Sequence, residues 1–137
     1  MNSVAQPAGT SNAMRWIGRI LTGLVVLFMG FDSIIKIIKI DPVVQSLAAL
    51  GFPDSVARGI GALEVVITLL YLFPRTAVLG AVLLTGVMGG GIASHLRVGD
   101  PVFSHLLFGV YLGVLAWGGL WLRDPALRAL MPVRRRS

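Results

Sequence analysis

Residues 61–124 have the sequence GALEVVITLLYLFPRTAVLGAVLLTGVMGGGIASHLRVGDPVFSHLLFGVYLGVLAWGGLWLRD, three long apolar runs separated by short polar segments. We expect helices from about Ser55 to Phe73, Thr76 to Leu96 and Val102 to Leu122, each long enough to cross a bilayer. Pro74 ends the first run. Asp100-Pro101 precedes the third, where Asp can cap a helix and Pro fits its first turn. The stretch therefore predicts three consecutive membrane-spanning helices.

A fourth apolar run lies upstream, from about Trp16 to Ile40. A cleaved signal peptide is the alternative, but the segment is too long and too charged at its end. Amphipathic stretches at Val43 to Leu50 and Ala126 to Met131 follow Asp–Pro pairs and are expected at the membrane interface. The predicted fold is all-α, a transmembrane four-helix bundle with short interfacial helices.

The composition favours a membrane protein over a soluble one. Of the 137 residues 55% are hydrophobic and 13% charged, whereas a soluble domain carries roughly a quarter charged residues. The net charge of +6 comes from basic residues between the apolar runs and at the C-terminus, which favours lipid headgroups as partners and argues against nucleic acid. The absence of cysteine excludes disulfides, Cys-ligated clusters and covalently attached haem for this chain.

Three segments are predicted along the chain. Residues 1–13 are polar, small and uncharged and are interpreted as a disordered tail, with Met14 an alternative start. Residues 14–132 form one four-helix membrane domain, and residues 133–137 form a basic tail.

The distribution of basic residues predicts the orientation. Eight fall on the side shared by both termini and the second loop: Arg15, Arg19, Arg75, Arg123, Arg128, Arg134, Arg135 and Arg136. Four fall on the other side: Lys36, Lys39, Arg58 and Arg97. The positive-inside rule then places the N-terminus and the C-terminus in the cytoplasm.

Ionisable residues within the predicted spans gather in one layer. At about 1.5 Å of rise per residue, Asp32 lies roughly 5 Å outward of the midplane, and Glu64 lies near the same level. Lys36 follows Asp32 by four residues, a spacing that lets them pair, and His95 and His105 fall within about a turn of Lys36. We expect Asp32, Lys36 and Glu64 to form one hydrogen-bonded cluster, with His95 or His105 nearby.

Two interpretations of this layer remain open. Intramembrane carboxylates are costly unless paired or neutralised, so they mark either a pair that fixes helix packing or a functional site. Glu64 has Ile60 and Thr68 at the i±4 positions and must find its partner on another helix. The layer is a hypothetical ligand-binding site, and no residue is assigned as catalytic or metal-binding. Because both histidines lie beside a connecting loop, a bis-histidine haem b is disfavoured.

Glycines occur at small-xxx-small spacing in the last two spans, Gly86 with Gly90 and Gly109 with Gly113. This spacing permits close helix approach, so we expect a crossing at Gly90 and Gly109. The alternative is a gap left for a ligand beside the histidines.

The segment 61–124 and the upstream RILTGLVVLFMGFDSIIKI, residues 19–37, together resemble the DoxX-like family of small bacterial membrane proteins. The resemblance extends over about residues 15–132, with Val87-Met88 where an aromatic residue or leucine is expected. It implies a four-helix protein of the bacterial inner membrane. Since the family name derives from a subunit of a thiosulfate:quinone oxidoreductase, it also implies a small subunit or partner of a redox complex. The polar layer could then bind a quinone headgroup.

Three classes of function remain. The first is a small membrane subunit that assists a redox partner and binds a quinone or another small ligand. The second is a carrier of protons or a small solute that uses Glu64 and the histidines. The third is a structural or assembly protein, including a homo-oligomer, whose polar layer only fixes helix register. Intrinsic catalysis is least favoured, since no nucleophile–base pair, metal-spacing motif or nucleotide loop occurs.

Overall fold

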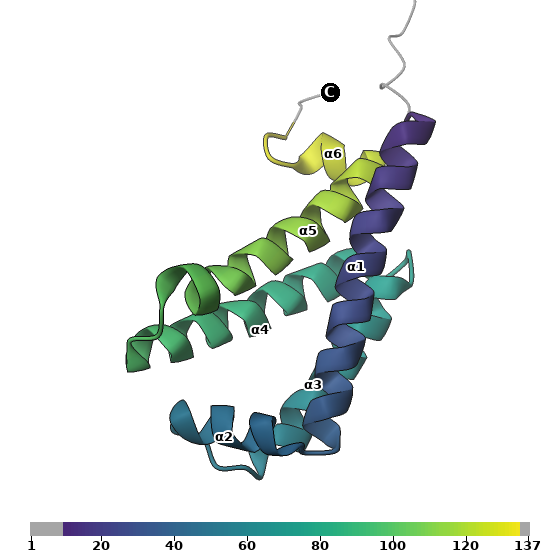
Figure 1. Cartoon of the computed structure of the whole chain (residues 1–137). Coiled ribbons are helices and arrows are strands. Elements are labelled where there is room, and N and C mark those ends of the chain that lie inside the picture. The colour runs from purple at the N-terminus through teal and green to yellow at the C-terminus, as the bar shows by residue number, and fades with distance from the viewer. Residues whose placement is uncertain (1–9, 135–137) are drawn as a thin grey trace, which may run out of the picture.

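The computed structural model describes residues 10–134, and every regular element in that range is a helix (Figure 1). The long helices are α1 (Asn12–Ile37), α3 (Val56–Leu72), α4 (Ala77–Val98) and α5 (Leu107–Arg123). A π-helical turn, η1 (Val102–Leu106), continues into α5. The short helices are α2 (Asp41–Ala49) and α6 (Pro125–Leu130).

Most of the two predicted tails, residues 1–13 and 133–137, lies outside the described residues. α1 already begins at Asn12, because the Ser11 side chain accepts a hydrogen bond from the Met14 amide and caps the helix. A helix is present at each of the two stretches that were predicted to lie at the interface. Asp124 caps α6 through the amides of Ala126 and Leu127, as expected for an Asp–Pro pair.

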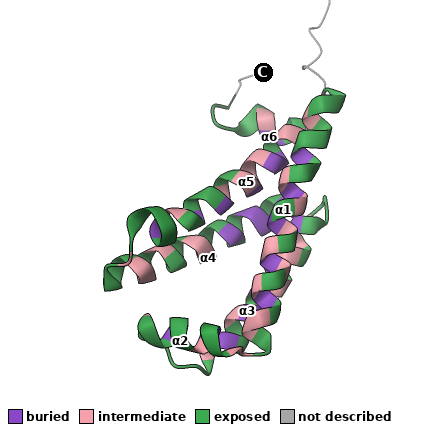
Figure 2. Ribbon diagram, viewed as in Figure 1, coloured by how far each residue is buried: buried purple, intermediate pink, exposed green. Residues whose placement is uncertain are grey.

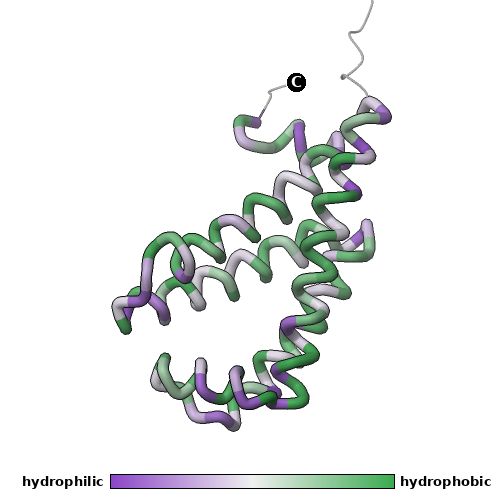
Figure 3. Tube along the Cα trace, viewed as in Figure 1, coloured by the Kyte–Doolittle hydropathy of each residue, from purple (hydrophilic) through white to green (hydrophobic). Residues whose placement is uncertain are grey.

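Three segments are long and apolar enough to cross a membrane: α1, α4 and the continuous stretch Val102–Arg123. Figure 3 shows that hydrophobic residues, in green, run along these helices. Many of their large hydrophobic side chains are exposed, and this surface suits lipid contact. α3 coincides with the predicted second span but has only 17 residues. The chain is therefore a membrane protein that is all-helical over its described residues, and its fourth span remains a prediction.

α1 packs against α3 and α5, and α4 packs against both α3 and α5. The shared core, marked by the buried residues in Figure 2, includes Val25, Met29, Ile67, Tyr71 and Leu84. α2 lies at one end of the molecule. Toward that end, the pair α4 and α5 diverges from the pair α1 and α3 (Figure 1). We call this end the α2 end and the opposite one the α6 end.

Glycines do make close helix contacts, but mostly not where the sequence predicted them. A Cβ at Gly119 of α5 would lie 3.1 Å from the Gly18 carbonyl oxygen of α1. Gly109 does face α4, where Ile92 would lie 3.1 Å from an added Cβ. No atom lies within 4 Å of the corresponding position at Gly90, so the predicted Gly90–Gly109 crossing is wrong. Gly109 instead faces Ile92 and the Met88 carbonyl oxygen, and Gly90 lies on an open face.

Candidate functional site

A cluster of three charged side chains joins α1 to α3. The Lys36 ammonium donates to Asp32 Oδ2 at 2.6 Å, one helical turn away on α1. It also donates to Glu64 Oε1 of α3 at 2.5 Å. The structure thus brings together three of the five residues predicted for the polar layer, and the partner of Glu64 is Lys36. We call these three side chains the acid–lysine cluster.

The close approach of the two helices at this level depends on Gly61, one turn before Glu64 on α3. A Cβ at Gly61 would lie 2.8 Å from the Ser33 carbonyl oxygen and 3.0 Å from Lys36 Cβ. Because Gly61 has no side chain, the backbone of α3 can lie directly against α1. This contact brings the Glu64 carboxylate within reach of the Lys36 ammonium.

The three side chains differ in burial. Glu64 is 1% exposed, whereas the side chains of Lys36 and Asp32 are 20% and 22% exposed. Glu64 Oε2 is enclosed and has no hydrogen-bond partner within residues 10–134. Glu64 is therefore the enclosed anchor of the cluster, and Lys36 with Asp32 forms its accessible rim.

The rim keeps hydrogen-bonding capacity. An ammonium has three N–H groups, and Lys36 uses two of them inside the cluster. Asp32 uses Oδ2 for Lys36, and Oδ1 has no partner in the described part of the chain. If all three groups are ionised, the cluster carries one net negative charge. It can offer one donor and one acceptor to a ligand that reaches the rim.

The two predicted histidines form a separate group. His95 Nδ1 lies 2.5 Å from Asp100 Oδ2, and His105 Nδ1 lies 2.7 Å from Ser104 Oγ. The rings of His95 and His105 meet edge to face with centroids 5.3 Å apart. In residues 10–134 no hydrogen bond or ion pair links either histidine to the acid–lysine cluster, so the five residues do not form one network.

The two polar groups nevertheless lie at a similar level. The rings of Phe28 of α1 and Phe108 of α5 are 5.0 Å apart. Asp32 lies about one turn after Phe28 along the chain, and His105 lies about one turn before Phe108. Both steps lead from the phenylalanine toward the α2 end. Since α5 diverges from α1 toward this end, the groups lie on separate helix pairs and do not touch. The sequence predicted a shared level for the two groups along the helices but not this separation.

The partner of His95 was missed by sequence reasoning. Asp100 was interpreted only as a helix cap before Pro101, although its position shortly after His95 was a usable signal. Gly99, with φ of 75°, turns the chain back at the end of α4 so that Asp100 reaches His95. Among residues 10–134, no three His, Cys, Asp or Glu side chains are grouped to hold a metal ion.

A second buried polar group lies toward the α6 end. The Tyr71 hydroxyl donates to the Ala116 carbonyl at 2.7 Å and lies 3.4 Å from Thr22 Oγ1. Nε and Nη2 of Arg123 are also buried, with no hydrogen-bond partner within the described range. The hydrogen bonds of Tyr71 link α3 with α5 and α1, so this group has a clear packing role.

Comparison with known proteins identifies one family. The model of the DoxX-like family matches residues 20–119, a range that includes all three residues of the acid–lysine cluster and both histidines. No curated protein matches the chain, and no solved structure does.

Proposed function

The chain belongs to the DoxX-like family, and from that premise we propose that it is a four-span membrane protein that binds a small membrane-soluble molecule at the acid–lysine cluster. A quinone headgroup is the ligand class that we favour. The observation that carries the proposal is the arrangement of Lys36, which is anchored by enclosed Glu64 and keeps a third N–H at an accessible rim. The protein would act as a small membrane subunit or partner of a redox complex in the bacterial inner membrane.

A fourth span is part of this proposal. α3 has 17 residues, which is near the lower limit of about 17 for a spanning helix. It packs against α1 and α4, and its exposed side includes Leu63, Val66 and Leu69. A short helix lined with apolar residues and packed between two spans is best accommodated across the bilayer. The basic-residue bias then supports cytoplasmic termini.

The donor and acceptor of the rim suit a quinone. A quinone carbonyl accepts a hydrogen bond, as the third Lys36 N–H could donate, and a quinol hydroxyl donates one, as Asp32 Oδ1 could accept. The apolar tail of such a molecule can stay in the lipid that surrounds the exposed hydrophobic helices. When bound, a quinone would supply reversible two-electron redox chemistry, whereas the residues of this chain bind and orient its headgroup.

The test is equilibrium binding of a short-chain ubiquinone to the purified protein in lipid nanodiscs. Asp32→Asn removes a charged acceptor at the rim but keeps the Lys36–Glu64 pair, so we expect about a tenfold loss of affinity. Lys39→Gln is the matched control, because Lys39 pairs with Asp54 outside the cluster. Equal affinity of wild type and Asp32→Asn would overturn the proposal, provided that both proteins have the same melting temperature.

Proton carriage is a second candidate, and one observation favours it. Glu64 Oε2 is enclosed and unpaired within the described residues, and a proton is the ligand that needs no additional space there. Liposomes containing the protein should then dissipate an imposed pH gradient faster than empty liposomes, and Glu64→Gln should abolish the difference. If neither quinone binding nor proton flux is found, the cluster serves only to fix the register of α1 and α3.

A further inference from the structure

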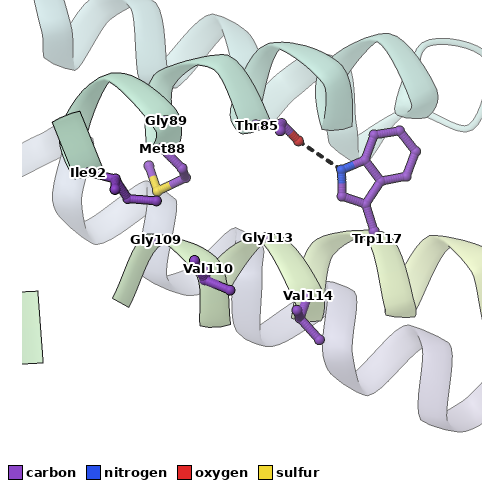
Figure 4. Close-up of a pocket in the computed structure, with 9 residues that line it drawn as sticks. All are labelled: Thr85, Met88, Gly89, Ile92, Gly109, Val110, Gly113, Val114 and Trp117. Atoms are coloured by element: carbon purple, nitrogen blue, oxygen red, sulfur yellow. Dashed lines mark hydrogen bonds between the residues drawn. The ribbon is translucent and has the colours of Figure 1, made fainter. Parts of the chain in front are cut away.

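A continuous apolar groove runs along α5, away from the acid–lysine cluster. Its first part has a volume of about 340 Å³ and lies between α4 and α5, with Met88, Gly89, Ile92, Gly109 and Trp117 among its lining residues (Figure 4). Its second part, of about 480 Å³, lies between α5 and α6 and includes Trp121, Leu127 and Met131. Both parts share Val114 and Trp117, so they form one groove.

The groove exists because glycines face it and one tryptophan is held across it. A Cβ at Gly89 or Gly113 would have no atom within 4 Å, so these positions leave open space between α4 and α5. The Trp117 indole donates to Thr85 Oγ1 of α4 at 2.8 Å, as the dashed line in Figure 4 shows. This hydrogen bond satisfies the polar atoms of both side chains and fixes the ring where the two parts meet. The remaining lining is almost entirely apolar.

The length of the groove fits a lipid chain. From Gly109 to Trp121 the groove follows α5 over about 18 Å at 1.5 Å per residue. One leaflet of the hydrocarbon core is about 15 Å thick, half of roughly 30 Å. A single acyl chain lying along α5 could therefore fill the groove from the bilayer interior to the α6 end.

Basic residues lie at the α6 end of the groove. The Arg128 guanidinium lies 5.8 Å from the ring centroid of Trp121, a groove residue. Its Nη1 donates to two carbonyl oxygens at the end of α5 and its Nη2 donates to Thr10 Oγ1, so two of its five N–H groups remain for a ligand. Arg15 and Arg19 lie in the first turns of α1 at the same end of the molecule. A guanidinium with free N–H groups beside an apolar groove attracts a phosphate.

We propose that the groove is a binding site for an anionic phospholipid, with one acyl chain along α5 and the phosphate beside Arg128. The site does not depend on the proposed function, since no residue of the acid–lysine cluster lines it. A second copy of the chain is a poorer occupant. In a two-fold pair of parallel chains the two Arg128 side chains would lie at the same membrane level and repel each other.

Native mass spectrometry of the protein released from detergent tests the proposal, with phosphatidylglycerol and phosphatidylcholine added in equal amounts. We expect retained phosphatidylglycerol in clear excess over phosphatidylcholine. Gly113→Leu fills the groove at its middle, and displacing a few methylene groups should reduce retention about tenfold. Gly23→Leu is the matched control, because Gly23 on α1 also has no atom within 4 Å and lies outside the groove. Arg128→Gln should reduce the preference for phosphatidylglycerol about fivefold.

Each alternative outcome contradicts the proposal. Equal retention of both lipids, or equal retention by Gly113→Leu and Gly23→Leu, would show that the groove has no specific lipid. A lipid-free dimer that Gly113→Leu dissociates would assign the groove to a second copy. Melting temperatures of the three variants establish that any loss of lipid is not a loss of fold.

Discussion

The Lys36 ammonium nitrogen lies 2.5 Å from Oε1 of Glu64. Within residues 10–134 it is the one ion pair that joins two of the long helices. Glu64 is 1% exposed and one of its oxygens has no described partner, so its charge depends heavily on this contact. Removing one member of a buried pair leaves an uncompensated charge, which is more destabilising than replacing both members.

Lys36→Met should therefore destabilise the protein by about 3–5 kcal/mol. The double variant Lys36→Met/Glu64→Met should recover most of that loss, because it removes the enclosed charge together with its partner and fills the space with apolar side chains of similar volume. Asp32 also loses Lys36 in both variants, but its side chain is 22% exposed and lies at the accessible rim. Denaturant unfolding in detergent, followed by circular dichroism, measures both. A double variant as unstable as Lys36→Met alone would show that the pair is not what stabilises the contact between α1 and α3.

Much of this cluster could be predicted from the sequence. The spacing of Asp32 and Lys36 fixes them on one helix face, and the lack of an i±4 partner for Glu64 required a partner across the bundle. Helix rise also gave the shared level of the histidines. Helix rise could not predict the tilt of each helix relative to its neighbours. The divergence of α4 and α5 is decided by tertiary packing, and it separates His95 and His105 from the cluster.

The same limit applies to the glycines. Small-xxx-small spacing identifies helix faces that can approach closely, but it does not say which neighbour approaches. Gly61 and Gly80 make close contacts although neither belongs to a predicted small-xxx-small pair. Gly86 and Gly90 form such a pair, yet both face open space. The four long helical segments were correctly predicted from the apolar runs, because that signal is local. The Asp–Pro pairs were a weaker guide: Asp124 caps a helix as predicted, whereas Asp41 and Asp100 do not cap one.

Gly61→Ala should destabilise the protein by about 1–3 kcal/mol, because the new methyl group would overpack the contact between α3 and α1. It would lie 2.8 Å from a backbone oxygen, and the helix would have to shift. Gly59→Ala is the control: it lies on the same helix in open space, and should be neutral or stabilising by up to about 1 kcal/mol through helix propensity. Melting temperatures in detergent compare the two. Similar values for both would contradict the close approach.

Asp54, in the loop between α2 and α3, should titrate below its ordinary pKa. The hydrogen bond from Lys39 at 2.9 Å, together with its positive charge, lowers the pKa of Asp54 from 3.8. A carboxyl whose pKa is lower in the folded state stabilises the fold above pH 3.8, and this contribution is lost as the pH falls through the folded-state pKa. Carbon-13 NMR of the Asp54 carboxyl measures the midpoint directly. In Lys39→Gln the midpoint should return toward 3.8, and an unchanged midpoint would show that Lys39 does not cause the shift.

Topology provides the test of the fourth span. If α3 crosses the bilayer together with the three longer segments, the N-terminus and the C-terminus lie on the same side. If α3 does not cross, they lie on opposite sides. Eight basic residues against four predict that the shared side is the cytoplasm.

A periplasm-active phosphatase fused after Ser137 should therefore be silent, and the same enzyme inserted after Gly99, between α4 and η1, should be active. A fusion to the N-terminus of the chain, read with a fluorescent reporter that works only in the cytoplasm, completes the set. Phosphatase activity after Ser137 together with cytoplasmic fluorescence at the N-terminus would leave α3 outside the set of spanning helices, and Glu64 would then lie at the membrane surface.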